Sequence, residues 1–263
     1  MKLKDKVIIV TASTRGIGLA ISEECAKEGA KVYMAARNLE RAESEAKRLT
    51  ESGYSVKCVY NDASVAESYA TMAEAVAKDA GRIDVLVNNF GTSNPKRDLD
   101  IWSTDADVFI DTVTVNLRSV FMASKEVYKY MKGRGSIINI SSVGGIVPDI
   151  SQIAYGTSKA AINYLTKLIA VHGAKEGIRC NAVLPGMTAT DAVMENLSDG
   201  FKEFFLKHIP LGRMGLPEEI AAAVVYFASD DSAYTTGQIL TVSGGFGLAT
   251  PLYGDLKDKT NRR

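Results

Sequence analysis

The sequence is poor in cysteine, histidine and tryptophan. Its three cysteines, Cys25, Cys58 and Cys180, are odd in number, far apart and without a C-x-x-C pair, which argues against a disulfide framework and a zinc site. The two histidines, His172 and His208, are also far apart and belong to no H-E-x-x-H motif. We therefore expect small buried thiols and no metal centre.

Net charge and long hydrophobic runs are absent as well. Lys and Arg together number 31, as do Asp and Glu, so the chain has no electrostatic footprint for nucleic acid or for an anionic membrane. No apolar run approaches the roughly 20 residues that span a bilayer. The run at residues 7–10 is too short for a signal peptide. We expect a soluble, cytoplasmic protein whose partner is a small molecule.

Short β-branched runs alternate with longer helical patterns along the chain. This alternation is typical of βαβ units, whose parallel strands are buried on both faces of the sheet. Helix starts are marked by Asn38, by a capping box of Ser64 and Glu67, and by Pro217. The expected strands are Lys6–Thr11, Lys31–Ala35, Val56–Tyr60, Ile83–Asn88, Ser136–Ser141, Ile178–Leu184 and Gln238–Val242. No linker or composition shift divides the 263 residues, so one α/β domain is predicted.

The first expected strand leads into a turn of small residues. Free backbone N–H groups and the dipole at a helix N-terminus favour a pyrophosphate there, and Gly16 and Gly18 let the backbone approach it closely. An ordinary tight turn is the alternative interpretation. The candidate phosphate-binding residues are Ser13, Thr14, Arg15, Gly16, Ile17 and Gly18.

Arg37 follows the second expected strand, where a dinucleotide-binding fold usually places the residue that meets the adenosine ribose. A carboxylate at this position would bind a free 2′-hydroxyl and repel a 2′-phosphate. Arg37, with help from Arg15, instead offers N–H donors to that phosphate. The sequence therefore predicts NADP rather than NAD, unless both arginines are merely solvated.

Tyr155 and Lys159 are four residues apart in a predicted helix, and Ser142 directly follows the fifth predicted strand. The spacing places both side chains on one helix face, where the ammonium favours the ionised form of the phenol. A tyrosine with an ordinary pKa of about 10 is a poor proton donor and acceptor at neutral pH. A neighbouring cation makes it usable for acid–base chemistry.

With these residues the chain resembles the short-chain dehydrogenase/reductases, whose active site combines Ser, Tyr and Lys with Tyr-x-x-x-Lys spacing. The resemblance implies a single-domain Rossmann fold over residues 1–263, with a doubly wound, seven-stranded parallel sheet flanked by helices. Ala12 departs from the pattern where the first glycine of the phosphate turn is usual, and Phe90 departs where alanine is usual. Further matches are Asn88-Asn89-Phe90-Gly91, Asn116, Pro185-Gly186 and Gly237–Gly245.

The resemblance also implies roles for individual residues. Tyr155 would be the general acid/base, Lys159 would lower its pKa and hold the nicotinamide ribose, and Ser142 would bind the substrate oxygen. Asn116 would complete a proton relay through water. Asp62 would meet the adenine. The other implied cofactor contacts, beyond the turn and Arg37, are Asn89, Gly91, Pro185, Gly186, Thr188 and Thr190.

Within the family, the chain is most similar to the bacterial 7α-hydroxysteroid dehydrogenases, which oxidise bile-acid hydroxyls. The similarity rests on Phe90-Gly91, on Val147-Pro148-Asp149-Ile150-Ser151 and on the tail-like Gly247–Pro251. It implies NADP-dependent, reversible oxidation of a 7α-hydroxyl to the 7-oxo product by hydride transfer. The alternatives are a 12α- or 3α-hydroxysteroid dehydrogenase, a 3-oxoacyl-carrier-protein reductase and a broad carbonyl reductase.

Residues 187–215 correspond to a substrate-covering loop with helices in this family, and residues 246–263 are expected to form a C-terminal tail. An apolar stripe in the loop fits a lid over a long apolar cleft as well as it fits ordinary core. Its members are Val193, Met194, Leu197, Phe201, Phe204, Phe205 and Leu206.

The alternatives differ in the surface that they require. A carrier-protein substrate would need clustered cations near the cleft mouth. A cofactor-binding regulator without catalysis is the alternative of another class, and the intact Ser, Tyr and Lys argue against it. The family resemblance further implies a homotetramer built through two long helices, residues 103–131 and 152–175, and the last strand. The candidate cations for a carrier protein, which also fit a solvated helix face, are Lys125, Lys129, Lys132 and Arg134.

Overall fold

The computed structural model describes residues 1–131, 133–196, 198–250 and 252–260 and is built around one sheet. The strands of this sheet pair in parallel in the order β3-β2-β1-β4-β5-β6-β7. The chain first winds outward from β1 to β3 and then from β4 to β7, which confirms the doubly wound Rossmann fold. The strands are β1 (Val7–Thr11), β2 (Lys31–Ala36), β3 (Val56–Tyr60), β4 (Val85–Asn88), β5 (Gly135–Ile140), β6 (Ile178–Pro185) and β7 (Ile239–Val242).

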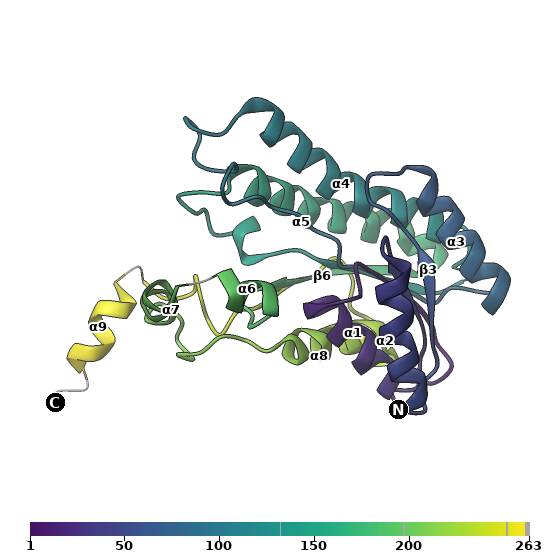
Figure 1. Ribbon diagram of the computed structural model, residues 1–263. Coiled ribbons are helices and arrows are strands. Elements are labelled where there is room, and N and C mark those ends of the chain that lie inside the picture. The colour runs from purple at the N-terminus through teal and green to yellow at the C-terminus, as the bar shows by residue number, and fades with distance from the viewer. Residues whose placement is uncertain (132, 197, 251, 261–263) are drawn as a thin grey trace.

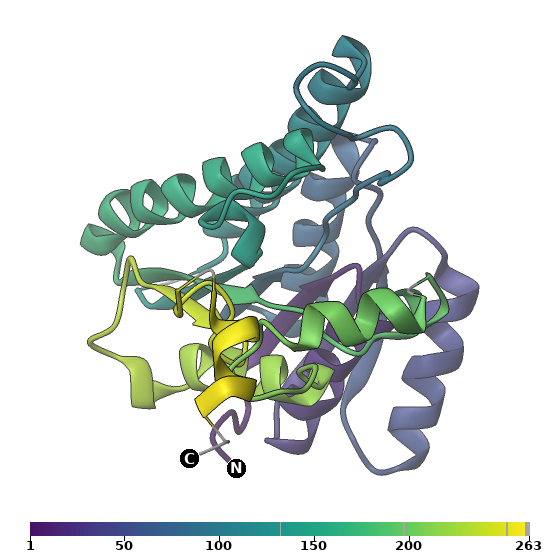
Figure 2. The same ribbon diagram turned by 90° about the vertical axis from the view of Figure 1, so that its left-hand side faces the viewer.

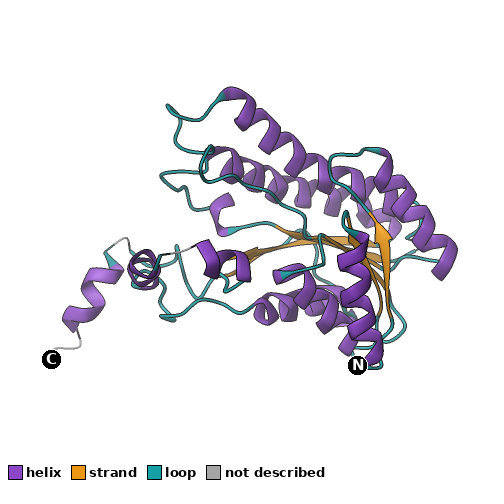
Figure 3. Cartoon of the chain, viewed as in Figure 1, coloured by secondary structure: helices purple, strands orange, loops and turns teal. Residues whose placement is uncertain are grey.

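Helices cover both faces of the sheet and enclose one hydrophobic core on each face (Figures 1 and 3). One face carries α1 (Gly16–Lys27), α2 (Leu39–Glu51) and α8 (Pro217–Ala228). The other carries α3 (Glu67–Ala80), α4 (Ala106–Tyr128) and α5 (Ile153–Gly173). Strands between two such cores are buried on both sides, which is why their sequences are nearly continuous apolar runs. Short 3₁₀ turns occupy η1 (Val143–Gly145), η2 (Ala174–Glu176) and η3 (Asp230–Ser232).

Two of the three predicted helix starts are confirmed. Asn38 caps α2 by accepting a hydrogen bond from the N–H of Arg41 at 2.9 Å. Pro217 is the first residue of α8. The predicted capping box of Ser64 and Glu67 is wrong, because the hydroxyl and N–H of Ser64 both donate to the Asp62 carboxylate, at 2.6 and 2.9 Å. Ser64 therefore belongs to a turn, and α3 begins at Glu67.

The carboxyl ends of the strands meet at one edge of the sheet, and the segments that follow β6 and β7 gather beyond it (Figure 2). These segments form α6 (Asp191–Asn196), α7 (Asp199–Leu206) and α9 (Tyr253–Thr260). Gly254 of α9 packs against His208, which follows α7. The predicted tail thus contains one helix, Tyr253–Thr260, while residues 251 and 261–263 lie outside the described residues. Among those described, no helix is both long enough and apolar enough to span a bilayer.

Candidate active site

The turn after β1 is closely packed at the start of α1. At Gly18, a Cβ atom would lie 2.4 Å from the carbonyl oxygen of Ala12 and 2.4 Å from Nδ2 of Asn89, so a larger residue requires the backbone to move. Arg15, the N-cap of α1, is extended and makes no side-chain capping hydrogen bond. Within the described chain, no capping side chain therefore competes with an anion at this helix N-terminus.

Ala12 adopts a left-handed backbone, with φ of 51°. This is the conformation that glycine adopts without strain, and it explains why the family pattern has glycine here. Ser13 is fully buried next to it, with its hydroxyl near the carbonyl oxygen of Ala35 at 3.5 Å. Thr14, Arg15 and the first turn of α1 complete the predicted phosphate site.

The carboxyl ends of β4 and β6 close on this turn. Asn89 donates its backbone N–H to Thr11 Oγ1 at 2.9 Å and its side-chain amide to the carbonyl oxygen of Ala12 at 3.0 Å. Beyond β6, the methyl group of Thr190 lies 3.2 Å from where a Cβ of Gly16 would be. Three predicted cofactor segments, distant in sequence, thus meet at one place. The remaining members, Pro185, Gly186 and Thr188, lie at the end of β6, where the Thr188 hydroxyl donates to the carbonyl oxygen of Gly186 at 3.1 Å.

Arg37 and Asp62 follow neighbouring strands, β2 and β3. Hydrogen bonds from Ser64 lower the pKa of the Asp62 carboxyl, and the positive charge of Arg37 lowers it further. The exposed Arg37 makes no side-chain hydrogen bond within the described part of the chain, and residue 36 before it is alanine, not an acid. The N–H donors of Arg37, with no acidic residue directly before them, fit a phosphate at the ribose end of a dinucleotide.

Tyr155 and Lys159 share one face of α5, as the spacing predicts. Nζ of Lys159 lies 5.5 Å from the centroid of the Tyr155 ring and donates to the carbonyl oxygen of Ile140 at 2.9 Å. Lys159 is 2% exposed, and burial lowers the pKa of its ammonium to about 8. Burial raises the pKa of the Tyr155 phenol, and a hydrogen bond with Ser142 opposes that change. The three side chains therefore form one interacting group.

Gly91 and Asn116 lie against this group. A Cβ atom on Gly91 would lie 2.9 Å from Nζ of Lys159, so the glycine makes room for the ammonium. The Asn116 amide donates to the carbonyl oxygen of Thr92 at 2.9 Å and to Ser158 Oγ at 3.0 Å, while its oxygen accepts from the N–H of Thr92 at 2.9 Å. The Asn116 side chain thus fixes the segment after β4 against α5.

A cleft of about 690 Å³ opens beside Tyr155 and Ser142, both of which line it. Its walls come from residues 99–101, the segment after β5, α5 and α7. Phe205 and Phe246 also line the cleft, and their rings stack with centroids 4.8 Å apart and planes 22° from parallel. A concave, largely apolar site with a few polar groups is typical of a small-molecule site.

The apolar stripe of the predicted lid is not core. Phe201 and Phe204 are 49% and 60% exposed, and Phe205 is one of the residues that line the cleft. Leu197, a further member of the stripe, lies outside the described residues. The arrangement favours the lid interpretation of residues 187–215.

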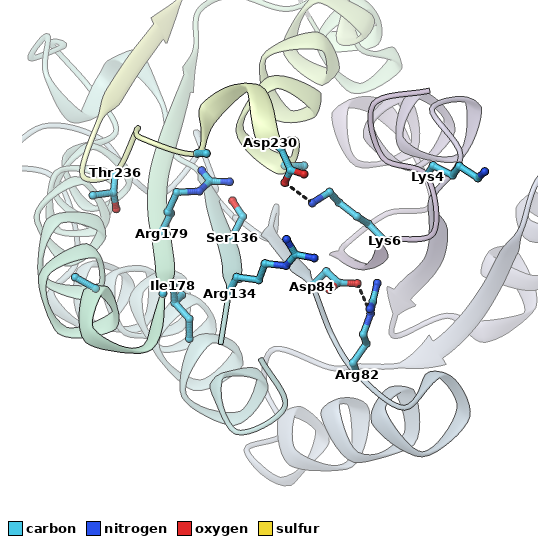
Figure 4. A pocket seen from close by; sticks show the side chains of 15 residues that line it. Lys4, Lys6, Arg82, Asp84, Arg134, Ser136, Ile178, Arg179, Asp230 and Thr236 are labelled. Atoms are coloured by element: carbon cyan, nitrogen blue, oxygen red, sulfur yellow. Dashed lines mark hydrogen bonds and ion pairs between the residues drawn. The ribbon is translucent and has the colours of Figure 1, made fainter. Parts of the chain in front are cut away.

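A second hollow, of about 490 Å³, lies at the amino ends of the strands, on the edge of the sheet opposite the cleft (Figure 4). Lys6 pairs with Asp230 at 2.9 Å, and Arg82 pairs with Asp84 at 3.0 Å. Arg179 donates to carbonyl oxygens at the end of α8, including that of Phe227 at 2.9 Å. The lining is basic, with five cationic and two acidic side chains, and two of the cations are paired with those acids. No group of the Tyr155 cluster lines the hollow.

The predicted carrier-protein patch lies toward this opposite edge. Arg134 lines the second hollow, and Lys125 and Lys129 are at the end of α4 that leads to it. Lys132 lies outside the described residues. Lys125, Lys129 and Arg134 are therefore not at the cleft mouth, where a carrier protein would dock.

Sequence reasoning missed Asp98. This fully buried carboxylate accepts hydrogen bonds from the N–H groups of Ala154 and of Tyr155 itself, at 2.8 and 2.9 Å. A single aspartate in a loop has no partner at a fixed spacing and matches no motif, so no signal in the sequence marks it.

A dinucleotide-type phosphate turn facing a Ser-Tyr-Lys group on a doubly wound sheet defines a nicotinamide-dependent oxidoreductase of the Rossmann type. A family model described as enoyl-(acyl carrier protein) reductase matches residues 11–247, and the chain belongs to the short-chain dehydrogenase/reductase family. It is thus an oxidoreductase that uses a nicotinamide cofactor and a small-molecule substrate.

Particular relatives extend over almost the whole chain. The 7α-hydroxysteroid dehydrogenase of Clostridium sardiniense is 50% identical over 256 residues, 97% of this chain and 98% of the relative. The enzyme of the same name from Paraclostridium sordellii is 50% identical over 258 residues, with 97% and 96% covered. The crystal structure of gox2181 superposes with a TM-score of 0.90 at 29% identity and covers 94% of this chain and 98% of its own. The resemblance stated from the sequence is confirmed.

Proposed function

We propose that the protein is an NADP-dependent 7α-hydroxysteroid dehydrogenase that reversibly oxidises the 7α-hydroxyl of bile acids to the 7-oxo product. The observation that carries the proposal is the position of Ser142 and Tyr155 on the wall of a large apolar cleft. Two relatives with this printed activity, at 50% identity over nearly their full length, support the choice of substrate.

In the proposed reaction, the bound nicotinamide supplies the hydride chemistry at the carbinol carbon. Ser142 donates a hydrogen bond to the substrate oxygen. Tyr155 takes the hydroxyl proton during oxidation and returns it to the carbonyl oxygen during reduction. The Lys159 ammonium stabilises the phenolate form of Tyr155. A relay through water from Lys159 toward Asn116 stays a prediction.

The residues that would hold NADP can be grouped by the part of the cofactor that each would contact. The turn after β1 would bind the pyrophosphate, Arg37 with Arg15 the 2′-phosphate, and Asp62 the adenine. Tyr155 and Lys159 would hold the nicotinamide ribose. The segments after β4 and β6 would enclose the nicotinamide end, through Asn89, Gly91, Pro185, Gly186, Thr188 and Thr190.

The cleft fits a steroid better than a carrier-protein substrate. A steroid presents a long apolar face, which the stacked rings of Phe205 and Phe246 match. The described candidate cations for a carrier protein, Lys125, Lys129 and Arg134, lie toward the other edge of the sheet. A 12α- or 3α-hydroxyl stays the alternative, because the same cleft would accept the same skeleton in another orientation.

We also propose a homotetramer built through α4, α5 and β7. Large apolar side chains stand exposed on the outer faces of these two helices, a pattern that marks interaction surfaces. The support comes from Ile110 (59% exposed), Phe121 (50%), Tyr164 (65%) and Val171 (72%). Sedimentation of the purified protein at several concentrations tests this proposal, and a concentration-independent monomer contradicts it.

Enzyme assays with a panel of 3α-, 7α- and 12α-hydroxy bile acids test the function, with NADPH or NADH absorbance as the readout. We expect oxidation of 7α-hydroxyl groups with NADP, and Arg37→Asp shifts the preference toward NAD. Tyr155→Phe lowers kcat by about 10²- to 10⁴-fold. If acetoacetyl thioesters are reduced while no bile acid is oxidised, the steroid proposal fails.

A further inference from the structure

The helix that carries Tyr155 begins without a cap of its own. The first four N–H groups of any α-helix lack partners within the helix. Gln152, the N-cap of α5, makes no side-chain capping hydrogen bond and has a left-handed backbone with φ of 58°. The acceptors for this helix end must therefore come from elsewhere.

Two consecutive residues of another segment supply all of them. The loop between β4 and α4 crosses the start of α5, and its residues 98 and 99 provide four oxygen atoms. The first bond inside the helix then runs from the N–H of Gly156 to the carbonyl oxygen of Gln152 at 2.9 Å. The four external bonds are Gln152 N–H to Asp98 O (3.1 Å), Ile153 N–H to Leu99 O (3.2 Å), Ala154 N–H to Asp98 Oδ1 (2.8 Å) and Tyr155 N–H to Asp98 Oδ2 (2.9 Å).

The Asp98 side chain is fully buried, and both of its carboxylate oxygens are used in this cap. A carboxylate at a helix N-terminus is stabilised by the N–H groups and the dipole, which offset the cost of removing it from water. One of its two bonds goes to the backbone of Tyr155 itself. The carboxylate therefore fixes the backbone from which the phenol projects.

The same loop also builds the substrate side of the site. Residues 99–101, directly after Asp98, line the cleft. Earlier in the loop, Ser93 donates its hydroxyl to Oε1 of Gln152 at 2.8 Å, and Thr92 is held by Asn116. Asp98 is thus the point at which the cleft wall and the helix that carries Tyr155 are joined.

We propose that Asp98 is a positioning residue for Tyr155, whose carboxylate clamps the start of α5 to the cleft wall and sets the place and proton affinity of the phenol. This inference rests on the proposed function, in which Tyr155 is the proton donor and acceptor. Asp98 is fully buried and does not line the cleft, so it acts through the helix.

Asp98→Asn tests the role of the carboxylate with little change in shape. The amide keeps one acceptor oxygen, but its NH₂ group faces a backbone N–H, so one of the two bonds is lost. A displaced phenol lowers kcat by about 10- to 100-fold. We expect cofactor affinity, measured by titration of NADPH fluorescence, to change by a smaller factor than kcat, because the phosphate turn and Arg37 are unaltered and supply cofactor contacts of their own.

The pH profile of kcat for alcohol oxidation separates positioning from a general loss of stability. The charged groups around the phenol are Lys159 on α5 and, in the cleft lining, Asp100 and Asp149, and none of them is altered. Loss of the Asp98 charge exposes Tyr155 to the positive end of the helix, which favours the phenolate. We therefore expect the pH of half-maximal kcat to fall in Asp98→Asn.

Asp105→Asn is the matched control. Asp105 caps α4, accepting from the N–H groups of Asp107 and Val108 at 2.9 and 3.4 Å, and α4 packs against α5. We expect this variant to keep the kcat and the pH profile of the unaltered protein. Asp98→Glu retains the charge in a longer side chain and should keep the original pH midpoint while kcat falls.

The outcomes separate this inference from the proposed function. Failure of the unaltered protein to oxidise any hydroxysteroid overturns the proposed function, and any alcohol that it does oxidise then serves as the substrate for the variants. If Asp98→Asn and Asp105→Asn share the same kcat and pH midpoint, Asp98 does not position Tyr155. If Asp98→Asn does not fold, an unchanged kcat in Asp98→Glu overturns the inference, and a lowered kcat at an unchanged midpoint supports it.

Discussion

Replacing Lys159 by methionine should increase stability near neutral pH while removing activity. Burial lowers the pKa of this lysine from its ordinary 10.5 to about 8. The difference of about 2.5 units corresponds to about 3 kcal/mol at 1.36 kcal/mol per unit. The native state bears this cost below pH 8, where both folded and unfolded chains carry the proton. Methionine fills similar space without charge.

One contact works against the gain. Nζ of Lys159 donates to the carbonyl oxygen of Ile140 at 2.9 Å, and a buried carbonyl left without a partner costs about 1–3 kcal/mol. The net gain near pH 7 is therefore about 1 kcal/mol. The dependence on pH isolates the charge. Between pH 8 and 10.5, the unfolded chain binds a proton that the native lysine has released, so the unaltered protein becomes more stable as pH rises. Lys159→Met lacks this increase.

Urea unfolding of both proteins at pH 7 and pH 10, followed by far-UV circular dichroism at one fixed protein concentration, measures the difference. Fluorescence is a poor probe because the single tryptophan, Trp102, is 90% exposed. We expect the unaltered protein to gain about 2–3 kcal/mol on Lys159→Met between the two pH values. An equal difference in unfolding free energy at both pH values would refute the reasoning, as would full turnover by the variant.

Three further substitutions test the turn and the cleft. Gly18→Ala places a Cβ 2.4 Å from the carbonyl oxygen of Ala12 and should lower both the melting temperature and cofactor affinity, the latter about tenfold or more by fluorescence titration. Ala12→Gly relieves a left-handed alanine and should raise the unfolding free energy by about 1 kcal/mol in urea titration. Phe205→Ala removes the ring stacked on Phe246 and should raise the steroid KM about tenfold, with little effect on a small secondary alcohol.

Gly200→Ala is the control for the first of these, since a Cβ at Gly200 meets nothing within 4 Å. Equal cofactor affinity in Gly18→Ala and Gly200→Ala contradicts the close packing of the turn. A less stable Ala12→Gly contradicts the strain at that position. Equal KM changes for steroid and small alcohol contradict a steroid-specific role of Phe205.

Local patterns carried most of what could be predicted from the sequence. The five residues of β1 are all buried, because two helical layers cover the sheet, so the strand is legible as an apolar run. The proximity of Tyr155 and Lys159 could be predicted because residues four apart in a helix lie on the same face. The predicted capping box of Ser64 is wrong because the N–H and hydroxyl of Ser64 donate to the Asp62 carboxylate. Short polar side chains can bond to several nearby groups, and the sequence does not show which of them is chosen.

Contacts between distant segments could not be predicted in this way. Asp98 and Ala154 are 56 positions apart, and only the folding of the loop after β4 over α5 brings them together. The exposure of α7 likewise depends on where α9 and the cleft lie, and an apolar stripe with helical spacing is the same in a lid and in a core. The candidate site was therefore predicted as a set of side chains, without the loop that holds them.

The joint at Asp98 has a consequence for attempts to change the selectivity of this protein. Leu99, Asp100 and Ile101 are natural targets for redesign because they form one side of the cleft, but they are anchored next to the residue that holds the reactive tyrosine. Substitutions at these three positions are therefore expected to lower kcat even where they widen the range of accepted substrates. Phe205 and Phe246 line the same cleft from segments that do not cap α5, so a library confined to them can explore new substrates while proton transfer is left intact.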